Sequence, residues 1–155
     1  MMAGGATLRL GPLAADHQDE LATFRCRQFK APWTDGIEEL VQTRLAGELE
    51  LGAIEALGLW RDDLLVGVVA WSRQPARPEV LHCVLLAVRT GHLRRGHGMR
   101  LKSALLEHGR AAGALAIESD VHFDNDPMLE LNLKLGANIE RISGDPDYLF
   151  CVIRL

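Results

Sequence analysis

The feature that most constrains this chain is a glycine- and arginine-rich stretch between an apolar run and a helical pattern. The stretch covers 88–99 and reads Val-Arg-Thr-Gly-His-Leu-Arg-Arg-Gly-His-Gly-Met. The apolar run 80–88 predicts a buried strand, and the periodicity of 100–112 predicts a helix. Glycine lets the backbone turn tightly, and the free N–H groups at the positive end of a helix dipole bind phosphate. We therefore predict a strand–loop–helix cradle for the pyrophosphate of a cofactor.

Spacing excludes two common nucleotide-binding loops. A Walker-type loop needs Gly-Lys-Ser/Thr at the helix start, where this chain has Gly98, Met99 and Arg100. A dinucleotide fingerprint needs three glycines and an acidic residue about 20 residues later. Only two glycines fit here, and the next predicted strand is not where that acid belongs. An ordinary strand–helix loop with solvated arginines is the structural alternative.

The composition is that of a globular chain. Its 155 residues are 48% apolar and 25% charged, which suits one domain over residues 1–155. The net charge of −4 argues against a nucleic-acid partner. Positive charge instead gathers near the loop, which suits a small anionic ligand. The residues of this group are Arg89, Arg94, Arg95, Arg100 and Lys102.

The apolar runs, the cysteines and the histidines argue against a secreted, membrane-spanning or metal-binding protein. We see no signal peptide and no apolar run near the roughly 18 residues that span a bilayer, so we expect a cytoplasmic protein without a membrane partner. The cysteines, Cys26, Cys83 and Cys151, form no CxxC pair, and we expect reduced thiols. The histidines show no metal-binding spacing, so we expect no metal. A homodimer is one alternative for the oligomeric state.

The rest of the chain predicts the element order β-α-α-β-β-β-α-β-α-β-β. This order implies a mixed sheet with helices on both faces and a right-handed, parallel crossover after the strand that precedes the loop. The predicted strands are 7–10, 54–60, 64–71, 79–88, 115–121, 139–142 and 148–155. The predicted helices start at the caps Asp16 and Asp126 or span 36–49 and 100–112, and the loops are 74–78 and 143–147.

The first helix should bury Leu21, Phe24 and Phe29 and end at Pro32. Trp33 then lies in a loop, either as an anchor on the core or as part of the wall of an acceptor pocket.

Two segments resemble one bacterial subgroup of the GNAT family of acyl-CoA N-acetyltransferases. The first is the Arg-Arg-Gly-His-Gly loop after an apolar strand, and the second is Asn-Asp-Pro-Met at 125–128 followed by Asn132 and Leu-Gly at 135–136. The resemblance covers about 64–142. It implies an α/β (α+β) GNAT fold, in which a mixed, mostly antiparallel sheet of six to seven strands splays in the middle.

The resemblance also implies how coenzyme A binds. The main chain of Leu86 and Val88 pairs with the pantetheine arm, the loop backbone and arginines hold the pyrophosphate, and Asn125 bonds the arm. The implied contact residues are Leu86, Val88, Arg94, Arg95, Gly96, His97, Gly98, Met99, Asn125 and Asn132. The chain departs from the family at Leu93, where Gln or Arg is common. Asn132 stands where many family members have a tyrosine that serves as general acid, so the acid is unassigned, and Tyr148, the one tyrosine of the chain, is a candidate substitute.

The catalytic base has two candidates. Some family members use a glutamate six residues before the last cofactor contact of the central strand, and the residue at that place is His82. Histidine titrates near neutral pH and suits this role, and strand alternation would put 82, 84, 86 and 88 on one face. The alternative is a hydrogen-bonded core histidine. Glu79, at the strand mouth, is a second candidate base that would act through water.

We therefore expect an acetyl-CoA-dependent N-acetyltransferase without a metal. A primary amine of a small molecule or peptide attacks the thioester in a ternary complex, and a strand N–H group, that of Leu86, stabilises the oxyanion. The alternative is a GNAT-fold sensor or interaction module that binds acyl-CoA without turnover. The acceptor pocket would involve 31–36 and 143–147, whose sequences do not specify the amine.

Overall fold

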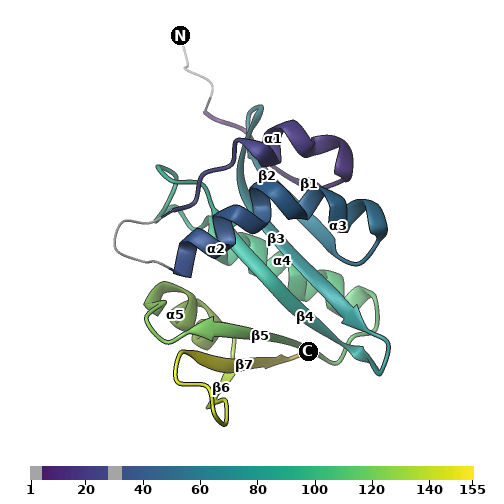
Figure 1. Cartoon of the computed structure of the whole chain (residues 1–155), viewed down its shortest axis with the longest axis vertical. Coiled ribbons are helices and arrows are strands. Elements are labelled where there is room, and N and C mark those ends of the chain that lie inside the picture. The colour runs from purple at the N-terminus through teal and green to yellow at the C-terminus, as the bar shows by residue number, and fades with distance from the viewer. Residues whose placement is uncertain (1–4, 28–32) are drawn as a thin grey trace.

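The chain folds into a seven-stranded sheet with helices on both faces (Figure 1). The structure is a computed structural model that describes residues 5–27 and 33–155. The strands are β1 (Leu8–Pro12), β2 (Glu55–Arg61), β3 (Leu64–Gln74), β4 (Arg77–Val88), β5 (Ala116–His122), β6 (Asn138–Arg141) and β7 (Tyr148–Arg154). The helices are α1 (Gln18–Ala22), α2 (Trp33–Glu39), α3 (Leu45–Leu51), α4 (His97–Ala111) and α5 (Asp126–Lys134). A 3₁₀ turn, η1 (Ala15–His17), precedes α1, and a π turn, η2 (Leu40–Arg44), joins α2 to α3. The predicted element order is confirmed.

The sheet splits between its two central parallel strands. Its order is β1-β2-β3-β4-β5-β7-β6, and every neighbouring pair is antiparallel except β4 and β5. These two strands pair only from Val80 with Ala116 to His82 with Glu118. Beyond His82 they separate toward the side where α2 and α5 lie (Figure 1). The predicted mixed sheet that splays in the middle is therefore confirmed.

A β-bulge in β4 changes which side chains face each side of the sheet. Two consecutive β3 residues lie opposite Cys83 and Leu85 of β4, so Val84 is the extra residue. As a result Leu81 and Cys83 pack on one face, whereas Leu85 packs on the other. The prediction that 82, 84, 86 and 88 share a face is wrong, because the bulge interrupts the alternation on which it rests.

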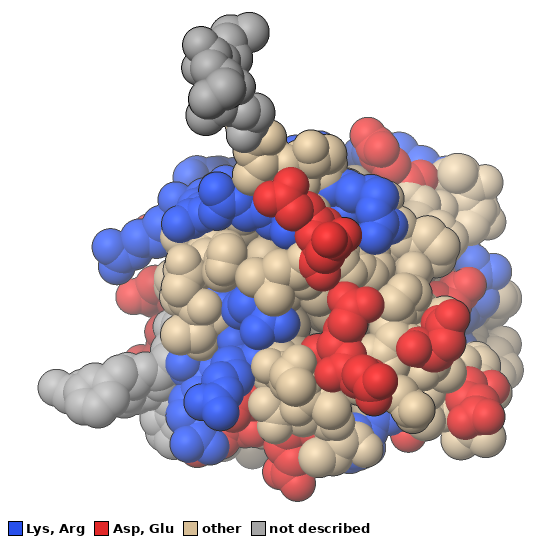
Figure 2. Space-filling model, turned by 90° about the horizontal axis from the view of Figure 1, so that it is seen from above, with Lys and Arg blue, Asp and Glu red and all other residues tan. Residues whose placement is uncertain are grey.

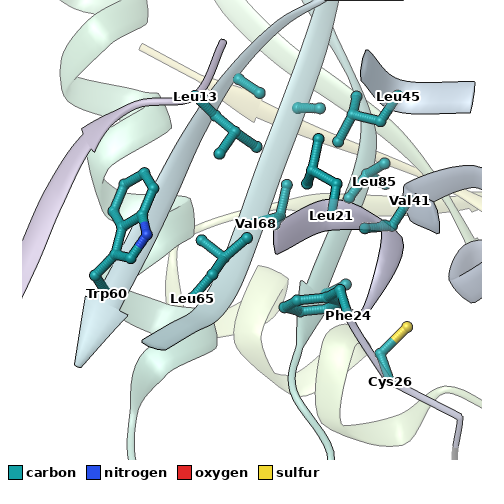
Figure 3. Packing of buried hydrophobic residues seen from close by; sticks show 13 residues of the cluster. Leu13, Leu21, Phe24, Cys26, Val41, Leu45, Trp60, Leu65, Val68 and Leu85 are labelled. Carbon is teal, nitrogen blue, oxygen red and sulfur yellow. The ribbon is translucent and has the colours of Figure 1, made fainter. Parts of the chain in front are cut away.

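Different helices cover the two faces. On one face α1, η2 and α3 pack around Phe24 and Trp60, as Figure 3 shows. On the other face the apolar stripe of α4 packs against β3 and β4. Strand β3 contributes to both cores, which is why it reads as a continuous apolar run. Leu21 and Phe24 are buried as predicted, while Phe29 and Pro32 lie outside the described residues.

Three local predictions are wrong. Asp16 lies inside the 3₁₀ turn instead of capping a helix, because the turn already starts after Ala14. Trp33 is the first described residue of α2 and not a loop residue. Pro78 belongs to β4, since β3 and β4 form a hairpin that turns at 75–76, and the proline lies where their register shifts.

Candidate active site

The loop between β4 and α4 presents an uncapped helix start. Gly96 has a φ of 78°, a left-handed conformation that suits glycine, and α4 begins directly after it at His97. The helix therefore starts three residues earlier than predicted. Arg94 also has a positive φ, 63°. Within residues 5–27 and 33–155 no side chain caps the start of α4, so the N–H groups of its first turn are available to an anion or to water.

The first cavity, of about 360 Å³, lies over this helix start between the end of β4 and the beginning of α5. Most predicted coenzyme contacts line it: Leu86, Val88, Arg94, Gly96, His97, Gly98, Met99 and Asn125. A Cβ added to Gly98 would lie 3.3 Å from Leu131 of α5 and 3.6 Å from Leu86 of β4. Because glycine has no side chain, this position leaves space in the cavity where α4 lies close to α5 and β4.

Two predicted contacts lie elsewhere. Arg95 is exposed and does not line the first cavity. Asn132 is fully buried inside α5, where its Nδ2 donates to the Met128 carbonyl oxygen at 2.9 Å. The structure therefore does not bring the Asn132 side chain to the cavity, because this bond turns it back along its own helix.

The loop has a positive electrostatic environment. Burial lowers the pKa of His97, and the charges of His92, Arg95, Arg100 and Arg61 lower that pKa further. Burial lowers the pKa of His92 in the same way, with contributions from Arg95, Arg61 and Arg89. A site that disfavours an added proton through nearby positive charge is one that favours an anion.

Charge is also unevenly distributed at the surface. In the face shown in Figure 2, blue basic side chains predominate toward the left, and red acidic side chains gather in the centre and on the right. A chain with a net charge of −4 thus still has regions of positive surface.

Asn125, and not Asp126 as predicted, caps α5. Its side-chain oxygen accepts the Met128 N–H at 3.3 Å, while Asp126 and Pro127 occupy the first two helical positions. Asn125 lines both the first cavity and a second one. The capping hydrogen bond therefore holds the polar side chain of Asn125 where the two cavities meet.

The second cavity, of about 260 Å³, occupies the split between β4 and β5. It shares five wall residues with the first cavity, so the two adjoin, and together they are called the cleft. The shared residues are Trp33, Ile37, Leu86, Asn125 and Met128. Trp33 thus lines the cleft, as one of its two sequence interpretations required.

His82 lies at the narrow end of the split, in contact with an ion pair. Its Nδ1 is 3.6 Å from Oε1 of Glu118, a distance too long for a hydrogen bond. Arg77 holds the Glu118 carboxylate with two hydrogen bonds, at 2.9 and 3.3 Å. Glu118 is buried, whereas the His82 side chain keeps 24% of its surface exposed and lines the second cavity. Arg77 therefore fixes the carboxylate against which the imidazole lies.

An aromatic group forms the opposite wall. The rings of Trp33 and His122 stack with centroids 5.7 Å apart, and Tyr148 meets His122 edge-on at 5.3 Å. All three line the second cavity. Tyr148 therefore lies at the cleft, as predicted, although its catalytic role stays a prediction. Glu79 is exposed and lines neither cavity.

The acceptor segments are only partly at the cleft. Residues 31–32 lie outside the described residues, and 33–36 belong to α2. The 143–147 turn lines a separate hollow that shares Tyr148 with the second cavity.

Sequence reasoning missed the polar residues that β5 brings to the second cavity, namely Ser119, Asp120 and His122. It grouped Lys102 with the basic residues near the loop, whereas the structure places Lys102 at the second cavity. Its spacing from Gly98, Leu105 and Gly109 indicates this, because it puts a charged residue on the buried stripe of α4.

The described residues contain neither a helix that could span a membrane nor a group of metal ligands. In residues 5–27 and 33–155 no helix combines the length and apolarity needed to cross a bilayer. In the same part of the chain no three His, Cys, Asp or Glu side chains cluster as metal ligands.

Comparisons with known proteins identify the family. The sequence matches the model of the Acetyltransferase (GNAT) family over residues 19–137. No curated protein matches it significantly. The fold is similar to that of the PaiA N-acetyltransferase of Thermoplasma acidophilum in complex with coenzyme A, with a TM-score of 0.78, 14% identity and coverage of 96% of this chain and 99% of that chain.

Two further solved structures show the same similarity. An acetyltransferase of Thermus thermophilus has a TM-score of 0.69 at 19% identity, with 96% of this chain and 97% of that chain covered. A Bacillus subtilis acetyltransferase in complex with coenzyme A has a TM-score of 0.64 at 21% identity, with 97% and 99% covered. These likenesses confirm the predicted fold, and the family model covers most of the sequence. The chain belongs to the GNAT family of acetyltransferases.

Proposed function

We propose that this chain is an acetyl-CoA-dependent N-acetyltransferase acting on a primary amine of a small molecule or peptide. The observation that carries the proposal is the cleft of two adjoining cavities, one over the uncapped start of α4 and one in the split between β4 and β5. Acetyl-CoA would lie along it, with its diphosphate at the glycine loop and its thioester in the split. The coenzyme A complexes of two structural neighbours support this choice of ligand.

The open edge of β4 supports the binding of the pantetheine arm. Beyond His82 no strand of the described residues pairs with β4 on its β5 side, so this edge is available to an added strand. An extended amide-containing arm would pair with the backbone N–H and C=O groups of this edge. A backbone N–H on this edge would also stabilise the oxyanion that forms when the amine attacks the thioester.

His82 is the base in this proposal. It lies at the narrow end of the split, beside the Arg77–Glu118 ion pair. In this mechanism the imidazole takes the proton that the amine nitrogen loses as it bonds to the carbonyl carbon. Leu86 packs on the opposite face of the sheet from His82 because of the bulge. Base and arm would therefore approach the thioester from different sides.

Direct attack is favoured over an acyl-cysteine intermediate. Cys26 lines the first cavity, but burial and then Glu38 raise the pKa of its thiol to about 12. Cys83 lines the second cavity on the face away from His82, and its Sγ is directed at the Leu85 carbonyl oxygen, 3.6 Å away. A thiol with a raised pKa stays protonated and is a poor nucleophile, and a thiol that donates to a carbonyl oxygen is not presented to a thioester.

A non-catalytic acyl-CoA sensor is the second candidate. It is favoured by Asn132, which replaces the family's tyrosine and turns its side chain into α5. Without a proton donor at that position, a bound thioester could persist.

The test combines binding and turnover on the whole chain. We expect coenzyme A to bind in isothermal titration calorimetry, and acetyl-CoA to release free thiol with at least one member of a panel of primary amines. Binding without thiol release for any amine would establish the sensor. Absence of coenzyme A binding would overturn both candidates.

A further inference from the structure

A buried lysine lies beneath the split with no charged partner. Lys102 of α4 is 1% exposed, and its Nζ donates one long hydrogen bond, 3.5 Å, to the Ser119 hydroxyl of β5. In the described parts of the chain no carboxylate lies within 4.0 Å of it. Burial of an ammonium is costly without a counter-charge. The proposed function so far gives this residue no role.

The helix aims Lys102 at the split. The preceding residue, Leu101, packs under β3, where a Cβ on Gly67 would lie 2.6 Å from its Cδ1. Lys102 follows it around the helix and reaches β5 at Ser119. Its side chain therefore lies below the gap between β4 and β5. It lines the second cavity, whose described wall contains no other Lys or Arg.

The reaction itself supplies an anion at this place. If acetyl-CoA occupies the cleft as proposed, breaking the carbon–sulfur bond leaves negative charge on sulfur in the second cavity. The position of the acid in many family members is occupied here by Asn132, whose side chain is turned away from the cavity and bonds within α5. Tyr148, the other candidate acid, is 38% exposed at the outer wall. A buried cation is the better counter-charge, because its attraction is least screened by water.

We propose that the Lys102 ammonium stabilises the coenzyme A thiolate as it leaves. This inference rests on the proposed function and deepens it. Ser119 fixes the ammonium beneath the split, and the ion is ready before the thioester arrives. The site is therefore arranged for the charge that develops in the transition state.

The atoms and charges of the step balance as follows. The amine nitrogen bonds to the carbonyl carbon and gives one proton to His82. The carbon–sulfur bond then breaks, and its electron pair stays on sulfur as a thiolate beside Lys102. In this step Lys102 serves only as a fixed positive charge, and no proton passes from it to the sulfur. The thiolate is protonated from water as coenzyme A leaves, and His82 returns its proton to water.

The decisive variant is Lys102→Met, which removes the charge and keeps the length of the side chain. Its matched control is Arg110→Met, which removes an exposed charge from the last turn of the same helix. Lys102→Arg tests whether a different cation restores the effect. Thermal unfolding of each variant checks the fold, and replacement of a buried charge by methionine should not lower stability.

The main readout is the pKa of the bound coenzyme A thiol, followed by thiolate ultraviolet absorbance. Complexes with desulfo-coenzyme A, which lacks the thiol, are subtracted to remove the signal of the protein's own cysteines. A free thiol has a pKa of about 8.5, and a cation within a few ångströms lowers such a value by about 1–3 units. We expect this lowering in the native protein, Arg110→Met and, in part, Lys102→Arg, and its loss in Lys102→Met. We also expect kcat of Lys102→Met to fall about 10²-fold.

Each other outcome overturns the inference. An unchanged thiol pKa in Lys102→Met would do so even if kcat fell, because the lysine would then only position other groups. A raised KM for the amine with an unchanged thiol pKa would assign Lys102 to a carboxylate of the acceptor instead. Coenzyme A binding that is retained in both cases would leave the proposed function standing. Failure of the native protein to bind coenzyme A would overturn both together.

Discussion

The first cavity takes half of its wall from one stretch of chain, the end of β4 with the loop and the first turn of α4, whereas the second cavity takes its wall from α2, β4, α4, β5, α5 and β7. In the first cavity the groups offered to a ligand are largely backbone N–H groups at a helix start. In the second they are side chains from elements far apart in sequence, such as His82 and Tyr148. A local motif therefore determines the cofactor end of the cleft, and the tertiary fold determines the reaction end.

This difference leads to different expectations for substitutions. Changes in the loop should alter coenzyme A affinity and leave the chemical step intact, because they act on binding in the ground state and the transition state alike. Changes in the split should lower kcat with little effect on coenzyme A affinity. Variants that reverse this pattern would break the comparison.

The largest effect is expected at the reaction end. His82→Ala should lower kcat by about 10²- to 10⁴-fold, because it removes the group proposed to take the amine proton. The dissociation constant of coenzyme A, measured by calorimetry, should stay the same. Glu79→Ala is the matched control, since Glu79 lies on the same strand but outside both cavities. If His82→Ala turned over as fast as the native protein, or if Glu79→Ala lost activity, the assignment of His82 as the base would be wrong.

The next effect sharpens the cofactor end. Gly96→Ala should weaken coenzyme A binding about tenfold, because a left-handed conformation costs an L-residue about 1–2 kcal/mol and the loop would relax away from it. Gly113→Ala is the matched control at the other end of α4. The two glycines have φ values of 78° and 80°, and neither has an atom within 4 Å of an added Cβ. Equal losses of affinity in both variants would mean that helix strain, and not the cradle, explains the result.

The same contrast explains what could be predicted from sequence. The loop, its helix and the element order follow from local patterns, so they were predicted closely. The placement of His82 relative to Leu86 was wrong, because no glycine or proline marks the bulge at Val84. The role of Asn125 as cap was missed because Asp-Pro is itself a strong helix-start signal. The ion pair beside His82, formed by Arg77 and Glu118, comes from strand pairing that only the folded sheet creates.

A smaller effect is expected where the two cavities meet. Asn125→Ala should lower the free energy of unfolding by about 1 kcal/mol, because it removes the cap of α5. Asn125→Ser keeps a capping oxygen and should recover most of this stability in urea unfolding. If Asn125 also bonds the coenzyme arm, both variants weaken coenzyme A binding, which separates its two roles. Equal stability of the two variants would contradict the capping role.

The smallest effect concerns pH at the cofactor end. The pKa values of His92 and His97 lie below the usual value because of burial and neighbouring positive charges. A bound diphosphate would offset those charges and raise both pKa values, so binding should take up protons. Coenzyme A affinity should therefore rise a few-fold as the pH falls toward and below about 6.5, the ordinary pKa of histidine. Calorimetry in buffers of different ionisation enthalpy measures the uptake directly. Pantetheine, which carries no phosphate, should show no such dependence, because it lies along β4 and away from the histidines in the proposed complex. An affinity for coenzyme A that falls with acid, or equal pH dependence for the two ligands, would place the diphosphate elsewhere than at the start of α4.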